Sequence, residues 1–267
     1  MQSKIVSGER SLDMQTFHKR SAQAAYGLSS MGIGDGDSIA LMLRNDFPFL
    51  EATFAASQIG AYSVPINWHY KERETAYILE NSDAKVIIVH TDLLPNLPST
   101  TKNTLKILAV TTPKEIIDAY SIANSDFAIP NQIIDWGKWR DEQLEWRAAP
   151  LANRGSMIYT SGTTGNPKGV RRFPASKELQ SAMMERLKLG FALQYGARAL
   201  MTGPMYHSAP NAYARAIVSL GGSLVLMPKF DAKQCLQMIE HFSITHMHVV
   251  PTMFIRLLQL PDHEKNK

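Results

Sequence analysis

The residues from 157 to 170 combine side-chain types that suit a phosphate group. A short run with β-forming side chains, Ile158 and Tyr159, is followed by glycines, hydroxyls and one lysine. Glycine lets backbone N–H groups approach an anion, hydroxyls add hydrogen-bond donors, and Lys168 supplies a compact positive charge. The candidate phosphate-binding residues, called the phosphate loop below, are Thr160, Ser161, Gly162, Thr163, Thr164, Gly165 and Lys168.

Two other interpretations of the phosphate loop are weaker. A Walker P-loop needs a glycine, four further residues and then Gly-Lys-Ser/Thr, but counting from Gly162 puts Pro167 where the second glycine belongs. An ordinary polar turn uses a few glycines and serines without this order. The order Ser-Gly-Thr-Thr-Gly-Asn-Pro-Lys-Gly instead resembles the phosphate-binding signature of the adenylate-forming superfamily, which includes acyl-CoA synthetases, luciferases and peptide-synthetase adenylation domains.

The resemblance implies an ATP-dependent reaction. In that family a carboxylate attacks the α-phosphorus of Mg²⁺-ATP to give an acyl-adenylate and pyrophosphate, and the thiol of coenzyme A then displaces AMP. The phosphate loop would cradle the β- and γ-phosphates, with Lys168 as a catalytic donor. The implied small molecules are therefore a carboxylic acid, ATP with Mg²⁺, and CoA, and no side chain is assigned as a metal ligand.

A second candidate segment, Pro204 to Pro210, follows a predicted strand. Open α/β sheets build their sites at the carboxyl ends of strands. By itself, His207 could equally be a turn histidine bonded to the backbone. The segment resembles the family's Pro-Leu-Tyr/Phe-His stretch, and this resemblance implies that Tyr206 and His207 lie beside the carboxylate under attack, with His207 in a catalytic role.

The residues after His207 narrow the class of acid. Amino-acid-activating relatives place an aspartate shortly after this histidine because a buried ammonium needs a paired charge, and residues 208–216 contain no carboxylate. Small side chains and one aromatic ring suit an apolar acyl chain or ring. The predicted substrate-binding residues are Tyr206, His207, Ala209, Asn211 and Tyr213. Together the two segments are most similar to acyl-CoA synthetases that act on fatty or alicyclic acids.

Predicted strands and helices alternate along the chain at βαβ spacing, which is typical of doubly wound parallel sheets. Apolar runs predict strands at 38–43, 62–66, 85–90, 198–201, 223–227 and 246–250. Helical periodicity predicts helices at 13–31, 47–59, 71–81, 177–193, 211–220, 232–242 and 252–260. We expect an α/β fold of two βα-rich subdomains with mainly parallel sheets flanked by helices. Residues 1–173 would form the first and residues 174–267 an incomplete second.

Several other features are expected to be structural. Residues 60–67 and 74–85 resemble a second conserved stretch of the family, whose role there is mainly structural. Acidic neighbours argue against nucleic-acid stacking by Trp136, Trp139 and Trp146, so we expect them to pack on the core, the last two one heptad apart on a short helix. The strand-spaced pair His246 and His248 could bind a metal, but packing is favoured because no third ligand stands near by.

The composition is typical of a globular protein that binds small molecules. The 267 residues are 45% hydrophobic and 19% charged, and the net charge of +4 is spread without a basic block that would favour nucleic acid. The single Cys235 cannot form an intramolecular disulfide and is expected to be a packing residue. No apolar run approaches transmembrane length and residues 1–10 lack a signal-peptide core, so we expect a cytoplasmic protein.

The resemblance covers only the front portion of the family's length. The family's Gly-Tyr-Gly-x-Thr-Glu and Tyr-x-x-Gly-Asp stretches, its hinge and its C-terminal lid have no counterpart before Lys267. We therefore expect a truncated chain with little or no ligase turnover alone, and self-association through apolar surface left uncovered. Two alternatives stay open: a non-catalytic nucleotide- or acyl-binding module, and a different adenylate-forming enzyme such as a luciferase-like oxygenase.

Overall fold

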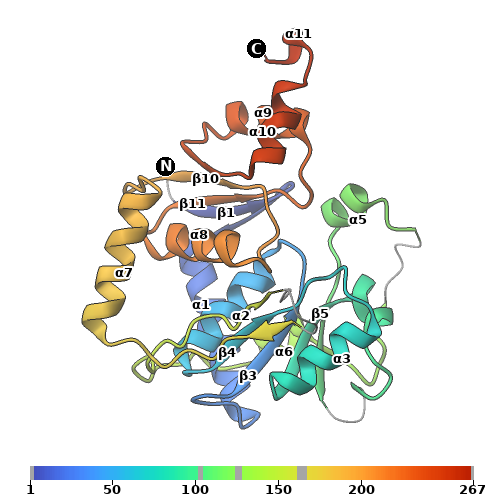
Figure 1. The fold of residues 1–267 in the computed structure, drawn as a ribbon. Coiled ribbons are helices and arrows are strands. Elements are labelled where there is room, and N and C mark those ends of the chain that lie inside the picture. Colours follow the sequence, from blue (N-terminus) through green and yellow to red (C-terminus); the bar gives the residue numbers. More distant parts are fainter. Residues whose placement is uncertain (1–2, 102–104, 124–127, 161–166, 266–267) are drawn as a thin grey trace. The chain divides into compact units, whose positions relative to one another are not determined.

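The computed structural model describes residues 3–101, 105–123, 128–160 and 167–265 (Figure 1). The chain divides into two compact units, and each is described by itself. The central unit comprises Gln15–Gln180. The split unit combines Met1–Met14 with Ser181–Lys267.

Within the described residues, the central unit is built on a five-stranded parallel sheet in the order β4-β3-β5-β6-β7. Its strands are β3 (Ser38–Met42), β4 (Tyr62–Pro65), β5 (Ala84–His90), β6 (Lys106–Val110) and β7 (Ile134–Asp135). All residues of β3 and β4 are buried, as expected of parallel strands covered on both faces. Its helical segments are α1 (Met14–Ser30), α2 (Phe47–Gln58), α3 (Glu72–Asn81), η1 (Thr91–Asn96), α5 (Lys114–Tyr120) and α6 (Trp136–Asp141).

Helix α2 shows how sequence and tertiary contacts together place an element. It begins at Phe47 because the preceding Asp46 accepts a hydrogen bond from the Phe47 backbone N–H at 2.8 Å. Its buried Glu51 carboxylate accepts hydrogen bonds from Arg140 at 2.7 Å and from the Trp136 indole at 3.2 Å, both on α6. A buried charge requires such partners, so Glu51 ties α2 to α6.

The prediction of core packing is confirmed for Trp136, whereas the prediction that Trp139 and Trp146 share a helix is wrong. Trp136 is 1% exposed, and its ring centroid lies 5.5 Å from that of Trp139. Helix α6 ends at Asp141, so Trp146 does not share a helix with Trp139. The heptad spacing misled because the chain leaves the helix before it reaches Trp146, whose backbone N–H donates to Ala22 on α1.

The sheet of the split unit has the strand order β12-β10-β11-β1-β2 among the described residues. Its strands are β1 (Lys4–Ser7), β2 (Arg10–Asp13), β10 (Arg198–Met201), β11 (Ser223–Leu226) and β12 (His246–His248). Only the β1–β2 pairing is antiparallel within this sheet. Its helices are α8 (Ser208–Ser219), α9 (Ala232–His241), α10 (Pro251–Leu258) and α11 (Asp262–Lys265), and α7 (Lys177–Gly190) crosses from one unit to the other.

Cys235 is part of the core of the split unit. It lies at 0% exposure in one cluster with Leu200, Val225 and Leu257. Burial raises the pKa of its thiol to about 11, so the thiolate is disfavoured at neutral pH. This placement agrees with a packing residue.

The α/β class with mainly parallel sheets is confirmed, but the structure divides the chain differently from the predicted boundary near Pro174. The strand β1 at the amino end pairs with β11, more than 200 residues away, with Ile5 opposite Leu224. The residues up to Met14 therefore belong with the second subdomain and not with the first. In the part of the chain that the structure describes, no helix is long and apolar enough to cross a membrane.

Candidate functional site

The phosphate loop is carried by a short antiparallel hairpin of the central unit. Its strands are β8 (Tyr159–Thr160) and β9 (Lys168–Gly169), with Thr160 opposite Lys168. Both of these residues are exposed, so the Lys168 ammonium and the Thr160 hydroxyl lie at the base of the loop in contact with solvent. The predicted residues outside the described part of the chain are Ser161, Gly162, Thr163, Thr164 and Gly165.

The charge of this segment suits an anion. No Asp or Glu occurs between Glu145 and Glu178, whereas Lys168, Arg171 and Arg172 all lie there. A segment with exposed basic side chains and no carboxylate of its own attracts phosphate groups at long range. The described residues therefore fit a polyphosphate ligand.

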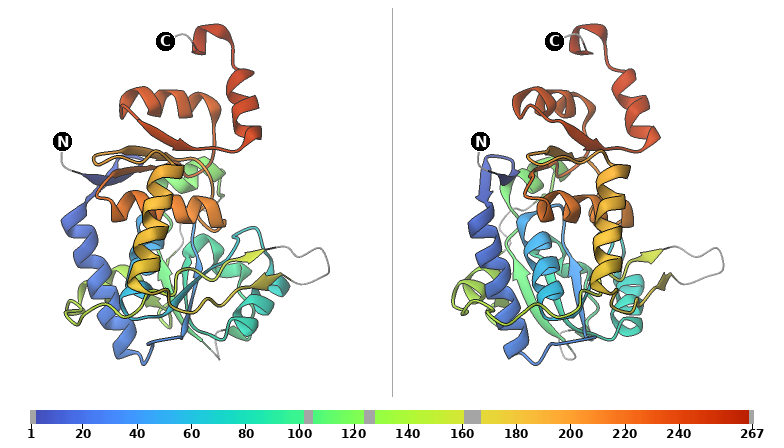
Figure 2. Two further views of the ribbon diagram at one scale, coloured as in Figure 1. Left: turned by 60° about the vertical axis from the view of Figure 1, so that its left-hand side comes forward. Right: turned by 90° about the vertical axis from the view of Figure 1, so that its left-hand side faces the viewer.

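Two side chains attach the hairpin to the carboxyl end of α3. Figure 2 shows the hairpin ribbon from two sides. The buried Tyr159 hydroxyl donates a hydrogen bond to Oδ1 of Asn81 at 2.7 Å. An Nη2 donor of Arg171 binds the carbonyl oxygen of Ser82 at 2.8 Å. Burial raises the pKa of Tyr159, so its hydroxyl stays protonated and remains a donor. These contacts were not predicted, although Asn81 and Ser82 lie in the second stretch that resembles the family.

The chain on either side of the hairpin is fixed to β4. Before the hairpin, the Met157 backbone N–H donates to the carbonyl of Ser63 at 2.8 Å. After it, the Tyr62 hydroxyl donates to the carbonyl of Arg172 at 2.6 Å. The strand β4 is itself held at the edge of the main sheet, so the hairpin leaves and returns to a rigid element.

The second candidate segment forms the turn between β10 and α8 in the split unit. His207 is the N-cap residue of α8, but its ring makes no capping hydrogen bond. The ring centroids of Tyr206 and His207 are 4.4 Å apart, with Tyr206 buried and His207 exposed. Partial desolvation lowers the pKa of His207, so the imidazole is neutral at physiological pH.

The remaining predicted substrate residues lie on the first turns of α8. Ala209 is exposed, whereas Asn211 is buried and donates from Nδ2 to the carbonyl of Met205 at 3.1 Å. Tyr213 is 1% exposed, and its ring centroid lies 5.2 Å from Phe191 and 5.8 Å from His248. The segment thus brings Tyr206, His207 and Ala209 together at the start of one helix.

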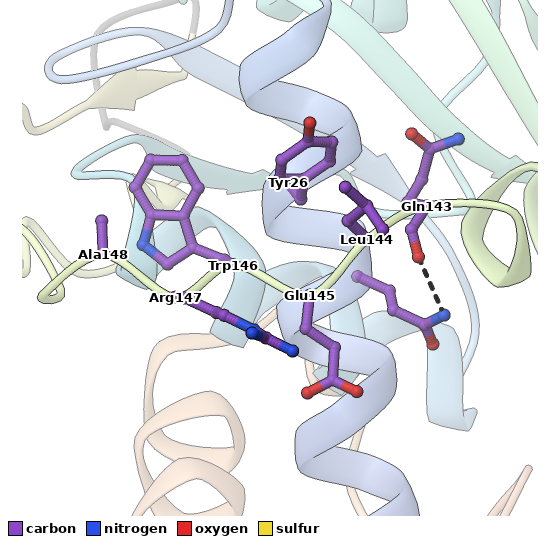
Figure 3. A pocket seen from close by; sticks show the side chains of 8 residues that line it. Tyr26, Gln143, Leu144, Glu145, Trp146, Arg147 and Ala148 are labelled. Carbon is purple, nitrogen blue, oxygen red and sulfur yellow. Dashed lines mark hydrogen bonds between the residues drawn. The ribbon is translucent and has the colours of Figure 1, made fainter.

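A separate cavity of about 580 Å³ lies between α1 and the segment 143–148 of the central unit (Figure 3). Tyr26, Leu144 and Trp146 line it, and Gln23 closes one side by donating to the carbonyl of Gln143 at 3.1 Å. None of the predicted site residues lines this cavity. It therefore has no part in the proposed chemistry.

No metal centre is found in the part of the chain that the structure describes. It contains no group of three or more His, Cys, Asp or Glu side chains that could hold an ion. The ring nitrogens of His246 lie 2.7 Å from the Thr245 hydroxyl and 2.8 Å from the carbonyl of Ala192. His248 packs against aromatic rings. Both histidines therefore have structural contacts.

Curated relatives of this chain include acid–CoA ligases. The chain is 29% identical to 4-hydroxybutyrate--CoA ligase 2 of Metallosphaera sedula over 91% of its own length and 43% of that protein. It is 29% identical to the long-chain-fatty-acid--CoA ligase FadD13 of Mycobacterium tuberculosis over 88% of its length and 43% of that protein. The chain thus spans less than half the length of these relatives.

Solved structures share the fold. The anthranilate CoA ligase AuaEII in complex with anthranoyl-AMP matches 98% of this chain and 49% of its own length, with a TM-score of 0.81 and 22% identity. The o-succinylbenzoate CoA synthetase MenE of Bacillus subtilis in complex with ATP and magnesium matches 97% of this chain and 49% of its own, with a TM-score of 0.74 and 20% identity. The family model described as "AMP-binding enzyme" matches residues 2–267, so the chain belongs to the family of AMP-binding, adenylate-forming enzymes, as the phosphate-loop signature predicted.

Proposed function

We propose that this chain is the nucleotide- and acid-binding front portion of an acid–CoA ligase that activates an apolar carboxylic acid. A carboxylate oxygen attacks the α-phosphorus of ATP and pyrophosphate leaves. The thiolate sulfur of CoA then attacks the acyl carbon, and AMP leaves as the thioester forms. The observation that carries the proposal is the signature loop on an exposed hairpin, with Lys168 and Thr160 paired at its base.

The residues of the hairpin would bind and orient the triphosphate. Lys168 neutralises charge on the β- and γ-phosphates, and the Thr160 hydroxyl adds a donor. Mg²⁺, when bound with ATP, supplies further neutralisation of the phosphate oxygens. The absence of any acidic residue between Glu145 and Glu178 supports this assignment, since a carboxylate there would repel the nucleotide.

The turn before α8 would hold the acid. The neutral, exposed ring of His207 is not used to cap the helix, so it is available to a carboxylate or to the developing acyl-adenylate. Tyr206 packs beside it and would form one wall of the site, and the exposed Ala209 would line the acyl side. Asn211 and Tyr213, in contrast, are buried. An apolar acid is favoured because residues 208–216 contain no carboxylate to pair with a substrate ammonium.

Pyrophosphate release tests this proposal. In a full-length protein that contains this chain, we expect pyrophosphate release with fatty and alicyclic acids and little release with amino acids. Completion of the reaction to the thioester should require CoA. We expect residues 1–267 alone to show little or no turnover, since they span less than half of the catalytic relatives. Turnover by residues 1–267 at the rate of a full-length ligase would contradict this last point.

Two other outcomes would favour the alternative functions. Nucleotide binding without any turnover in a longer protein would favour a binding module, and oxygen-dependent light emission would favour a luciferase-like enzyme.

A further inference from the structure

The hairpin that carries the phosphate loop is too short to fix its own position. Each strand contributes two residues to the pairing of β8 with β9. A two-stranded hairpin is marginally stable at best in water. Contacts from outside the hairpin must therefore determine where Thr160 and Lys168 lie.

Both strands of the hairpin are attached to consecutive residues at one helix end. Tyr159, in β8, donates its hydroxyl proton to Asn81 at 2.7 Å, and Asn81 is the last residue of α3. Arg171, two residues after β9, donates to the carbonyl of Ser82 at 2.8 Å, and Ser82 is the C-cap of the same helix. The carbonyl groups at a helix carboxyl end lack helical partners and carry partial negative charge, which favours a guanidinium donor.

The ring of Tyr159 also packs against the opposite strand, so it connects β8 with β9. A Cβ atom at Gly169 would lie 2.5 Å from Cζ of Tyr159, so the ring rests directly on the backbone of the opposite strand. The ring can reach Asn81 only because position 169 has no side chain. One tyrosine thus joins β8 to β9 through its face and to α3 through its hydroxyl.

We propose that Tyr159, Asn81 and Arg171 are positioning residues for nucleotide binding, which hold the Lys168–Thr160 base of the phosphate loop against the carboxyl end of α3. This inference rests on the proposed function. None of the three need touch ATP. We call these three residues the anchor. Without one of their contacts, Thr160 and Lys168 would adopt other positions as well, and the free energy needed to return them to the binding position would weaken the affinity for ATP.

Two variants, each with a matched control, test whether Tyr159 and Asn81 hold the hairpin in place. Tyr159→Phe keeps the ring on Gly169 and deletes only the hydroxyl. Asn81→Ala removes the acceptor, whereas Asn81→Asp keeps an Oδ acceptor and should keep the hydrogen bond from Tyr159. Tyr195→Phe, which deletes a hydroxyl on a residue that is 95% exposed, is the control.

The first measurement is the affinity of the 267-residue chain for Mg²⁺-ATP by calorimetry. We expect Tyr159→Phe and Asn81→Ala to weaken binding about three- to tenfold, the range of one net hydrogen bond. Tyr195→Phe should bind like the wild type, and Asn81→Asp should keep the wild-type rate of amide exchange at the hairpin. In the ligase reaction of a full-length protein that contains this chain, the same variants should raise the KM for ATP and leave the KM for the acid unchanged, a split that a merely structural role would not produce.

The second measurement is amide hydrogen exchange at the hairpin, which does not depend on nucleotide. Amides of the β8–β9 ladder should exchange about tenfold faster in Tyr159→Phe than in the wild type. Unchanged exchange, or unchanged ATP affinity in Tyr159→Phe and Asn81→Ala when the wild type binds, would overturn the anchor alone. No ATP binding by the wild type would overturn the proposed function, and the anchor's role in nucleotide binding with it.

Discussion

The two candidate segments are positioned in opposite ways. The phosphate-loop hairpin depends on contacts across the sequence: Tyr159 reaches Asn81 over 78 residues, and Tyr62 reaches Arg172 over 110. The turn that carries His207 has mostly short-range hydrogen bonds: the His207 backbone N–H donates to Pro204 at 3.1 Å, and Asn211 donates to Met205, six residues away. The Thr202 hydroxyl before it donates to His248, 46 residues away. Substitutions far away in sequence should therefore disturb the hairpin, whereas local substitutions should have the larger effect on the turn.

The largest expected loss of stability comes from removing a buried ion pair between distant residues of the central unit. Glu51→Ala removes the fully buried partner that lies 2.7 Å from the Arg140 guanidinium, and leaves the buried Arg140 paired with Asp141, whose side chain is 59% exposed. We expect the free energy of unfolding to fall by about 3–5 kcal/mol. Chemical denaturation measures the loss.

The matched control for Glu51 is Asp118→Ala. Asp118 pairs with Lys114 at 2.6 Å, but its side chain is 59% exposed. Water screens such pairs, so we expect a change below about 1 kcal/mol. An equal loss of unfolding free energy in the two variants would show that burial does not determine how much these ion pairs stabilise the protein.

A smaller effect is expected from a methyl group at the hairpin. Gly169→Ala places Cβ 2.5 Å from the Tyr159 ring, which must then move and give up Asn81. Overpacking of this kind costs about 1–3 kcal/mol, and we expect at least tenfold weaker Mg²⁺-ATP binding. Gly190→Ala, where no atom lies within 4 Å of the added Cβ, should bind ATP like the wild type. Normal ATP affinity in Gly169→Ala would contradict the close contact.

The local turn should respond more weakly. Asn211→Ala removes the hydrogen bond from Nδ2 to the Met205 carbonyl, and we expect a loss of about 0.5–1.5 kcal/mol in the unfolding free energy. Amide exchange at β8 and β9 should stay unchanged, because the turn is locally built. Faster exchange at the hairpin in this variant would break the contrast between the two segments.

The smallest expected effect is a pH dependence in the split unit. Burial lowers the pKa of His248 below its ordinary 6.5. The unfolded chain then binds more protons than the folded one as the pH falls through 6.5, so His248 reduces stability on the acid side. We expect His248→Phe to lose part of the stability decrease between pH 7 and pH 5, measured by thermal unfolding. An unchanged slope in His248→Phe would assign the decrease to other groups.

The sequence was informative where structure is local. The apolar run at 85–90 and the period at 47–59 correspond to β5 and α2 within a residue, because short-range patterning determines them. The strand β1 was not predicted, since its pairing with β11 lies more than 200 residues away. Strand β6 was also not predicted.

In the candidate site, too, the features within one segment could be predicted from the sequence, whereas the contacts between distant segments could not. The phosphate-loop signature could be identified because its chemistry lies in consecutive residues. The contact of Tyr159 with Asn81 could not, since nothing in either segment marks the other as its neighbour. Only the presence of Asn81 and Ser82 in a second family-like stretch signalled that this helix end had a role.

Binding of Mg²⁺-ATP to wild-type and Lys168→Ala chains tests the central assignment most directly. Lys188→Ala is the control, because Lys188 is another solvent-accessible lysine that pairs with Glu185 on α7. We expect saturable binding by the wild type and the control, and binding about 10- to 100-fold weaker in Lys168→Ala, as expected for loss of a charged donor. Equal affinity in all three chains would contradict the assignment of this hairpin to the nucleotide phosphates.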